Sequence, residues 1–426
     1  MSNSPDATTA VSITTNTHET TSATQVNKWN KHDTHWVLSL FGTAVGAGIL
    51  FLPINIGIGG FWPLLIMVLL AFPMTFLAHR GLARFVLSSK RDNADFTDVV
   101  EEHFGKTAGR LISLLYFFSI FPILLIYGVG LTNTVDSFLV NQLALDTPPR
   151  VVLSGILVAF MIGLMLGGDK LLMRAFAALV YPLVAILFFL SVYLIPHWQV
   201  PTISTPEMPE LVSTLWLLVP IVVFSFSHAA AISSFVNVQR RHYRTHAHSK
   251  TEQILKCTSV ILIVFVLLFV ISCVLALTPE QMASAKQANV SVLSYLANVY
   301  QNPFIALLGP LVAFIAITSS FLGHFLGARE SFNGLVTKQF SLSITKADKL
   351  GIILMFIAIW LCAVINPSIL DMMGAISGPI IAMILFIMPT VAVFKIPALS
   401  QYKTQIGTYF VLIVGLLSVS ALLYNM

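Results

Sequence analysis

Long apolar runs, separated by short polar interruptions, follow one another along the chain from residue 34 onwards. A helix needs about 20 apolar residues to cross the hydrocarbon core of a bilayer, and most of these runs approach or exceed that length. Cutting the chain at its polar interruptions predicts about eleven transmembrane helices, at residues 35–57, 62–87, 107–140, 150–167, 171–195, 211–237, 254–277, 303–335, 349–366, 369–394 and 405–424. The pattern therefore predicts an all-α polytopic membrane protein embedded in a lipid bilayer.

The first 33 residues differ, because they form a polar run rich in serine, threonine and asparagine. A cleaved signal peptide would have an apolar core, which this run lacks. We expect residues 1–33 to be a disordered cytoplasmic tail, since such a composition buries too little apolar surface to fold. The rest divides into a first set of five helices at 34–195, a second set of five at 196–394 and an eleventh helix within 395–426.

Composition agrees with this interpretation, since 57% of the 426 residues are hydrophobic and 10% are charged. Soluble domains have about 45–50% apolar and about 25% charged residues. The three cysteines, Cys257, Cys273 and Cys362, lie inside apolar runs without metal-ligand spacing. We therefore predict neither a disulfide framework nor a metal site, and no cofactor.

Basic residues lie almost entirely on one side of the predicted topology. If the N-terminus is cytoplasmic, all of the 23 lysines and arginines except Arg150 and Lys286 fall on the cytoplasmic side. Lysine and arginine are enriched in cytoplasmic loops, and one missed helix would invert the sides of everything after it. We predict a multi-pass protein of the cytoplasmic (inner) membrane, with the N-terminus cytoplasmic and the C-terminus outside. The excess of basic residues is thus explained without nucleic acid as a partner.

The first predicted span is interrupted by Gly42, Gly46 and Gly48, followed by Pro53. Each interior glycine disfavours a helix by about 1 kcal/mol relative to alanine. Glycines in membrane helices also allow close packing of neighbouring helices, and Gly42 and Gly46 have that spacing. The segment is therefore either a broken helix or a close-packing surface.

The sixth span favours the first interpretation, because it contains Pro220 and then a polar interruption at residues 224–228. Spans one and six each begin a set of five helices, and five is odd, so the second set enters the membrane from the opposite side. This is a 5+5 inverted repeat with discontinuous helices 1 and 6 and one extra C-terminal helix. In such transporters the broken helices meet near the midplane, where freed amides hold a carboxylate and freed carbonyls hold cations. A zwitterionic amino acid carries both groups.

Short motifs spread over the chain make the assignment more specific. They read GTAVGAGILFLPINIGIGG at 42–60, FPMTF at 72–76, AHRGL at 78–82, VVEEHFG at 99–105, TNTV at 132–135, VFSFSH at 223–228, LSYLAN at 293–298, SFLGHFLGARE at 320–330 and GPIIAM at 378–383. Together they resemble the serine transporter branch of the hydroxy/aromatic amino acid permease family. The resemblance implies a fold of the amino acid–polyamine–organocation type and proton-coupled uptake of serine or threonine.

We expect the substrate carboxylate at the backbone of Gly46, Ala47 and Gly48, where a half-helix begins and its amides lack partners. The ammonium group would meet carbonyls near Thr43, Ala44, Phe224 and Ser225. Ser225 and Ser227 could bind the substrate hydroxyl, or instead bond the carbonyl one turn earlier in their own helix. Phe226 could close the site or simply pack. Tyr127 and Asn133, deep in the third span, could also face it.

Ionisable side chains at membrane depth are candidates for ion coupling, and few occur here. His228 and His324 could exchange protons near neutral pH, or could each be a neutral residue that joins two helices. Arg174 could stand in the place of a sodium ion, or extend to the membrane surface. The hydroxyl residues Thr318, Ser319 and Ser320 could bind substrate or a sodium ion.

The chain lacks a nucleotide-binding loop and any arrangement of catalytic residues, so we predict that it is not an enzyme and depends on an ion gradient. The predicted function is import of L-serine, with L-threonine as a further substrate, by alternating access and coupled to protons. A sodium-coupled amino acid symporter and a tryptophan or tyrosine permease of the same family are the alternatives. The sequence leaves the oligomeric state open.

Overall fold

The computed structural model describes residues 28–167, 169–200, 206–300, 302–340 and 342–424, without the side chains of 169–181, 338–340 and 424. Most of the predicted tail therefore lies outside the described residues. Its last part does not, because α2 (Lys31–Ala44) begins four residues before the predicted start of the first span. Asn30 caps this helix by accepting hydrogen bonds from the amides of His32 and Asp33. A side-chain cap of this kind is what allows a helix to start in a polar sequence.

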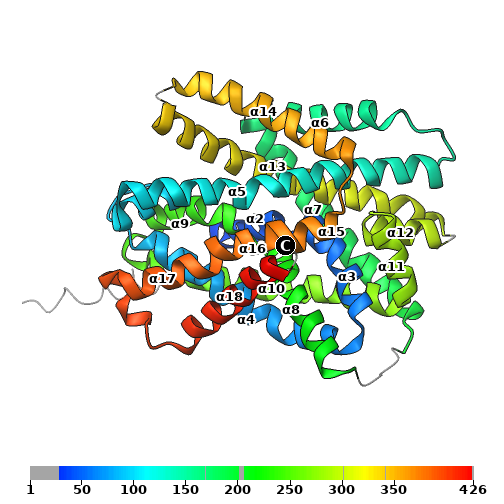
Figure 1. The fold of residues 1–426 in the computed structure, drawn as a ribbon, viewed down its shortest axis with the longest axis horizontal. Helices are drawn as coiled ribbons and strands as arrows, with labels where there is room; N and C mark the ends of the chain where they lie inside the picture. The colour runs from blue at the N-terminus through cyan, green and yellow to red at the C-terminus, as the bar shows by residue number, and fades with distance from the viewer. Residues whose placement is uncertain (1–27, 168, 201–205, 301, 341, 425–426) are drawn as a thin grey trace, which may run out of the picture.

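The described residues form helices and no strand. In order after α2 they are α3 (Ala47–Gly59), α4 (Phe61–Leu87), α5 (Phe96–Asn141), α6 (Arg150–Leu166), α7 (Asp169–Leu194), η1 (Ile195–His197), α8 (Met208–Ser225), α9 (Ala229–Tyr243), η2 (Arg244–His246), α10 (Ala247–Ala276), α11 (Pro279–Gln287), α12 (Val292–Val299), α13 (Pro303–Phe340), α14 (Ile344–Ile365), α15 (Ile369–Asp371), η3 (Met372–Ser377), α16 (Gly378–Ala382), η4 (Met383–Ile387), α17 (Met388–Lys395), η5 (Pro397–Tyr402) and α18 (Ile406–Tyr424). Figure 1 shows them as one bundle in which long helices run roughly in one direction.

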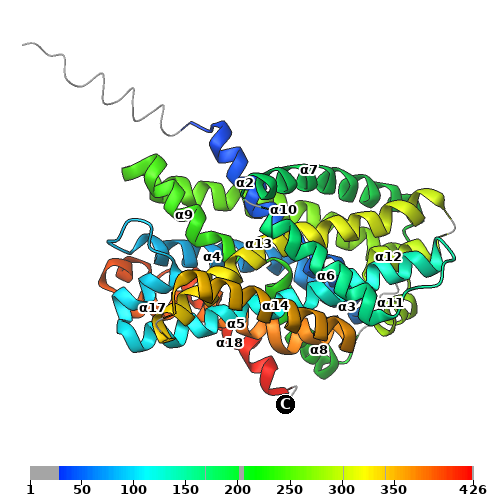
Figure 2. The ribbon, with the colours of Figure 1, turned by 90° about the horizontal axis from the view of Figure 1, so that it is seen from above.

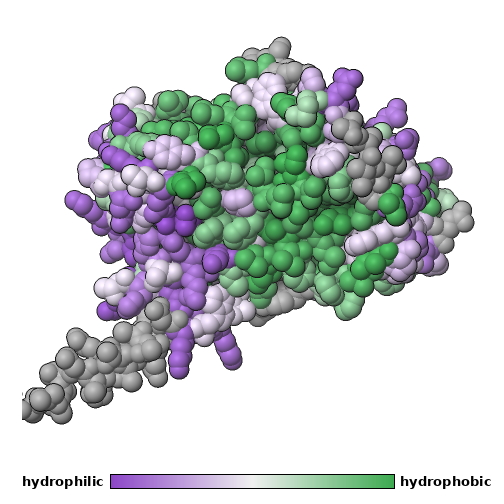
Figure 3. All heavy atoms as spheres, turned by 90° about the horizontal axis from the view of Figure 1, so that it is seen from below, coloured by the Kyte–Doolittle hydropathy of each residue, from purple (hydrophilic) through white to green (hydrophobic). Residues whose placement is uncertain are grey.

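The bundle has the lengths and surface that a bilayer requires. Eight described helices are long and apolar enough to span a membrane, the bent pair α2–α3 makes a ninth, and α6 and the described part of α7 are shorter apolar helices. Hydrophobic side chains cover the middle of the face seen in Figure 3, and hydrophilic ones gather toward the ends. Large apolar side chains such as Leu69, Phe189 and Leu416 are exposed, as expected for a surface that faces lipid. The chain is thus a multi-pass membrane protein, while the count of eleven spans stays a prediction.

Both predicted helix breaks are present. The axis bends by 58° between α2 and α3, and residues 226–228 separate α8 from α9. The prolines that suggested these breaks do not end a helix, because Pro53 lies inside α3 and Pro220 inside α8. Glycine at the first break and a polar segment at the second are therefore the features that accompany the interruptions.

The two broken helices meet in the middle of the bundle. α3 packs against α8, and the long helices α5 and α13 pack against each other and against α3 (Figures 1 and 2). The tenth predicted span is one continuous helix with two π-helical stretches, η3 and η4. Gly378, between those stretches, packs directly on the Pro220 carbonyl, so that even a methyl group there would overlap it. The tenth span therefore lies against α8, the half-helix before the second break.

Candidate functional site

The first break lies at Val45 and Gly46, between α2 and α3. Gly46 is the N-cap of α3, with extended backbone (φ −152°), and no side chain caps the helix. The first amides of a helix lack intrahelical partners and carry partial positive charge. The amides of Ala47 and Gly48 therefore turn the positive end of a half-helix toward the break, an arrangement that favours an anion.

Neighbouring atoms leave no room for a side chain at either glycine of this break. A Cβ at Gly46 would overlap the Ser320 hydroxyl and lie 2.9 Å from Tyr127 Oη. A Cβ at Gly48 would lie 2.7 Å from the Cα of Ser225. Close packing and helix interruption are therefore not alternatives here, because Gly46 does both.

The second break consists of Phe226, Ser227 and His228, all buried. The Phe226 amide still donates to the Val222 carbonyl, and the Ser227 amide donates to the Phe224 carbonyl three residues earlier. The last turn of α8 is therefore tighter than an α-helical turn. The Ser227 hydroxyl then accepts a weak hydrogen bond from the Ala229 amide at the start of α9 (3.4 Å). Ser227 thus acts as a loose cap for the second half-helix.

A hydrogen bond joins the two breaks directly. Ser225 Oγ, at the end of α8, donates to the main-chain carbonyl of Gly48 in α3 at 3.0 Å, and Ser225 is fully buried. The Ser225 hydroxyl therefore donates to α3 and not to the carbonyl one turn earlier in its own helix. The interaction holds one half-helix of each broken span against the other.

The helices α5 and α13 close the first break from the other side. Tyr127 Oη and Ser320 Oγ lie 2.6 Å apart, and Ser320 also donates to the Thr43 carbonyl at 3.3 Å. His324, one turn further along α13, hydrogen-bonds the Ser320 carbonyl through Nδ1 and meets the Tyr127 ring edge to face. These contacts place Tyr127, Ser320 and His324 in one cluster beside the break.

Ser319 and Thr318, the hydroxyl residues that precede Ser320 in α13, do not contact the first break through a hydrogen bond that the structure shows. Ser319 donates to the Ala316 carbonyl of its own helix. Thr318 Oγ1 is buried without a hydrogen-bond partner among the described residues. Since buried polar groups are normally satisfied, Thr318 is the member of this trio that a bound group would complete.

His228 is turned away from this cluster and toward α4. Its imidazole stacks on that of His79, with ring centroids 3.6 Å apart and planes 4° from parallel. The His228 amide donates to His79 Nε2 at 3.0 Å. Both histidines are buried, with exposed fractions of 1% and 0%. The second break is therefore anchored to α4 by a histidine pair.

Cavities approach the breaks from both ends of the bundle. One of about 370 Å³, lined by Asp95, Glu330 and others, shares Tyr116 and Ala230 with a small cavity that reaches Ser227 and His324. Another of about 800 Å³ at the opposite end is lined by charged residues of both signs and by Leu218 and Ile221 of α8. The residues of the breaks thus lie between two polar cavities.

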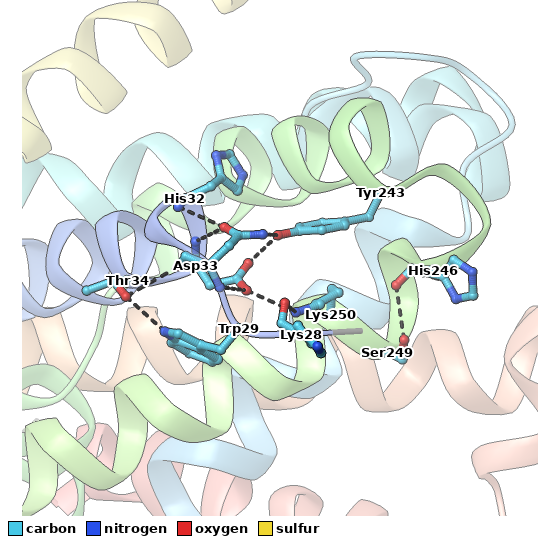
Figure 4. A network of polar contacts seen from close by, with 10 residues as sticks. Lys28, Trp29, His32, Asp33, Thr34, Tyr243, His246, Ser249 and Lys250 are labelled. Carbon is cyan, nitrogen blue, oxygen red and sulfur yellow. Dashed lines mark hydrogen bonds and ion pairs between the residues drawn. The ribbon is translucent and has the colours of Figure 1, made fainter. Parts of the chain in front are cut away.

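A buried ion pair joins the start of α2 to α10 (Figure 4). Lys250 Nζ of α10 lies 2.9 Å from Asp33 Oδ2 of α2, and both side chains are completely buried. The Tyr243 hydroxyl, at the end of α9, donates to the other oxygen of Asp33. Lys250 also donates to the Lys28 carbonyl. The half-helix before the first break is therefore attached to the half-helix after the second break and to α10.

The structure brings most of the predicted site residues together. Those at or directly beside the two breaks are Thr43, Ala44, Gly46, Ala47, Gly48, Phe224, Ser225, Phe226, Ser227 and His228, with Tyr127, Ser320 and His324 in contact and Thr318 and Ser319 in the adjoining turn of α13. Asn133 lies elsewhere, because it hydrogen-bonds Arg150, the Asn289 carbonyl and Asn366. The side chain of Arg174 lies outside the described residues.

Sequence reasoning missed His79. It is an ionisable residue inside a predicted span and so met the criterion that selected the other histidines. Only the fold reveals that His79 points to the second break, and nothing in the local pattern pairs it with a residue 149 positions away.

Comparisons with known proteins agree with this arrangement. Residues 35–424 match the model of the tryptophan/tyrosine permease family. The chain is similar to the serine transporter SdaC of Escherichia coli K12, at 48% identity over 97% of this chain and 99% of that protein. It is also similar to the threonine/serine transporter TdcC of Yersinia enterocolitica, at 41% identity over 95% and 98% of the two chains.

Among solved structures, the crystal structure of MhsT in complex with L-phenylalanine superposes with a TM-score of 0.57 and 15% sequence identity, over 93% of this chain and 97% of that one. This likeness and the helix breaks confirm the predicted fold class. The match over residues 35–424 and the two full-length relatives likewise confirm the resemblance that the motifs indicated. The chain belongs to the tryptophan/tyrosine permease family.

Proposed function

We propose that this chain imports L-serine, and L-threonine as a further substrate, across the cytoplasmic membrane as an ion-coupled symporter. The relatives named above support an amino acid as the substrate, since they are named as serine and threonine/serine transporters. The family as a whole indicates transport and not catalysis. In this proposal the basic end of the bundle faces the cytoplasm, in agreement with the positive-inside rule.

The observation that carries the proposal is the junction of the two breaks. The uncapped start of α3 at Gly46 lies beside the end of α8, which Ser225 joins to Gly48 by a hydrogen bond. In the proposal the amides of Ala47 and Gly48 bind the substrate carboxylate. Main-chain carbonyls of Thr43 and Ala44 receive the ammonium group. Charged ends of half-helices and freed carbonyls are what a zwitterion requires.

The narrow surroundings favour a small side chain. Gly46 and Gly48 have no room for even a methyl group. The small cavity beside the second break is lined by Ser227 and His324 together with isoleucines. In the proposal Ser227 hydrogen-bonds the substrate hydroxyl, and Phe226 forms the apolar wall. Ser225 keeps its hydrogen bond to the Gly48 carbonyl and so holds the ends of α8 and α3 together around the site.

Protons are the proposed coupling ion, because the second break contains His228 and the cluster on α13 contains His324. Sodium is the alternative, and the observation that favours it is the Thr318 hydroxyl, which has no hydrogen-bond partner in the part of the chain that the structure describes. Arg174 remains a candidate for the place of a sodium ion in α7. The two polar cavities at opposite ends of the bundle support alternating access.

The test is uptake into proteoliposomes of radiolabelled serine, threonine and tryptophan under an imposed proton or sodium gradient. We expect serine to accumulate under a proton gradient, threonine more weakly, and tryptophan not at all. Accumulation of tryptophan in preference to serine would establish the aromatic permease instead. If serine accumulates only under a sodium gradient, the proposed substrate is correct and the coupling ion is sodium. If neither serine nor threonine accumulates under either gradient, the proposal is wrong.

A further inference from the structure

The strongest unexplained feature of the molecule is the stacked pair of histidines at the second break. His79 comes from the middle of α4, and His228 is the N-cap of α9. Their ring centroids lie 3.6 Å apart with the planes nearly parallel, and both side chains are buried. Polar rings of this kind are rarely buried without a role, since each nitrogen needs a partner.

The hydrogen bonds of His79 fix its protonation state in this conformation. Its Nδ1 lies 2.7 Å from the Thr75 carbonyl, which only accepts, so Nδ1 carries the proton. Its Nε2 accepts the amide of His228 at 3.0 Å, so that nitrogen has no proton. His79 is therefore a neutral imidazole with both nitrogens occupied.

His228 differs in one respect. Its Nδ1 donates to the Phe226 carbonyl at 3.2 Å. Its Nε2 is completely buried and has no hydrogen-bond partner among the described residues. The pair therefore has one vacant lone pair, at His228 Nε2, and a proton can bind there without breaking any hydrogen bond that the structure shows.

Other charged groups face α4 at a different level. Arg240 of α9 donates to the Val86 carbonyl, and Glu252 of α10 pairs with Arg84. From α5, Glu102 and His103 reach Ser89 and Ser88. All of these contacts are five or more residues beyond His79, which is about 7.5 Å or more along the helix.

The elements α3, η4, α8, α17 and α18 also pack against α4, and any titratable residue in them can be placed in the same way. α3 and η4 contain no titratable residue. Glu210 of α8 and Lys395 of α17 lie in the terminal turns of their helices, and Tyr409 of α18 contacts Phe394. Among the described residues, the ring stacked on His79 is that of His228, whose amide also donates to His79 Nε2.

We propose that His79 and His228 form a binding site for a single proton, taken up at Nε2 of His228, with His79 as the positioning residue that holds the break in place. Stacking at this distance allows one imidazolium and disfavours two, because like charges repel strongly in a buried site. The site rests on the proposed function, and it assigns the coupling ion to one atom.

The position of His228 explains how this proton would be coupled to substrate. A cation at the N-terminus of α9 is disfavoured by the helix dipole. A carboxylate bound at the joined breaks offsets that repulsion, so each ligand favours the binding of the other. Such mutual stabilisation is reciprocal by thermodynamic necessity. Proton and amino acid would therefore bind together and leave together.

The site can be tested without any assumption about the substrate. Solid-state ¹⁵N NMR of the full chain in liposomes, labelled at histidine, would follow the ring nitrogens between about pH 8 and pH 5, where histidine titrates. Exposed histidines such as His35 and His242 also titrate in this range, so the variant identifies the signal. We expect one Nε2 signal that passes from the unprotonated to the protonated position in the wild type to be missing in His228→Gln. If that signal is present in His228→Gln, or does not move with pH, the proposal is wrong.

Transport assays then test the coupling. His228→Gln should lower proton-driven accumulation of serine at least tenfold while counterflow of serine continues. His248→Gln, at a half-exposed histidine of α10 far from the breaks, is the matched control and should behave as wild type. Wild-type accumulation in His228→Gln would overturn the proton site and leave serine transport standing. Failure of wild type to transport serine would overturn the proposed function, and the NMR titration would still decide the proton site.

The positioning role of His79 has its own signature. His79→Gln keeps an acceptor for the His228 amide and should retain coupled uptake within about threefold, as expected when a hydrogen-bond partner is conserved. His79→Leu leaves that amide unpaired and should shift the pH dependence of serine counterflow. A uniform loss in His79→Leu at every pH, with the wild-type profile retained, would show that His79 only supports the fold.

Discussion

Gly46 combines three roles: its backbone starts a helix, its lack of a side chain permits close packing, and its position is at the proposed substrate site. Its extended conformation starts α3, and its missing side chain makes room for Ser320 and Tyr127. We expect Gly46→Ala to push α13 away from the break, destabilise the protein by about 1–3 kcal/mol and weaken serine binding at least tenfold. Binding to purified protein and thermal unfolding would measure the two effects.

The control for that substitution is Gly163→Ala in α6. The space around Gly163 is open, so an added methyl group meets nothing. Alanine is the better helix former by about 1 kcal/mol, and the control should unfold at the same or a slightly higher temperature. If both variants bind serine like wild type, the first break is not where the substrate carboxylate lies.

Ser225 offers a second test at the same scale. Ser225→Ala removes the donor to the Gly48 carbonyl and should destabilise by about 1 kcal/mol, the usual contribution of a buried hydrogen bond. Because the bond joins the two broken helices, serine uptake should fall more than stability does. Ser191→Ala is the matched control, since Ser191 is buried and donates to the Leu187 carbonyl of its own helix. Equal effects of the two substitutions on uptake would contradict a special role for the junction.

Between elements, a completely buried ion pair connects α2 to α10. Lys250→Met would leave the Asp33 carboxylate buried without its cation, and breaking a buried ion pair from one side destabilises by about 3–5 kcal/mol. The double variant Asp33→Asn with Lys250→Met should recover part of the loss, because no charge is then left unpaired. Thermal unfolding of the single and double variants gives the comparison.

An exposed ion pair provides the reference for that prediction. Lys286 and Asp371 lie 3.8 Å apart with side chains that are 44% and 68% exposed. Exposed pairs contribute about 0–1 kcal/mol, so Lys286→Met should leave the unfolding temperature nearly unchanged. A loss in Lys250→Met no larger than in Lys286→Met would mean that the buried pair does not hold α2 in place.

The sequence predicted the elements well where a local pattern determines them. Apolar runs gave the helices, and glycine at Gly46 marked the first break, because both depend on neighbouring residues. The buried pair Asp33–Lys250 could not be predicted, since Asp33 belongs to a polar segment that we expected to be disordered. The same holds for Asn133, whose partners are 17 to 233 positions away, and for His79. Contacts between distant segments need the fold.

For the whole molecule, the proposed orientation decides which of the two cavities opens to which side of the membrane. The cavity at the basic end is lined by Glu330 of α13, and the cavity at the opposite end by Glu210 of α8. If the basic end is cytoplasmic, these two residues are reached from opposite sides of the membrane. The breaks lie between them, so a substrate must pass from one cavity to the other.

A labelling experiment can test that direction and the alternation together. Single cysteines replace Glu330 or Glu210 in a chain whose own three free thiols, at 257, 273 and 362, are changed to serine or alanine. We expect a membrane-impermeant maleimide to label position 210 from outside right-side-out vesicles, and position 330 only in inverted vesicles. Serine with a proton gradient should change the two labelling rates in opposite directions, because alternating access closes one cavity as it opens the other. Rates that rise together would indicate a channel, and labelling of position 330 from outside would reverse the proposed orientation.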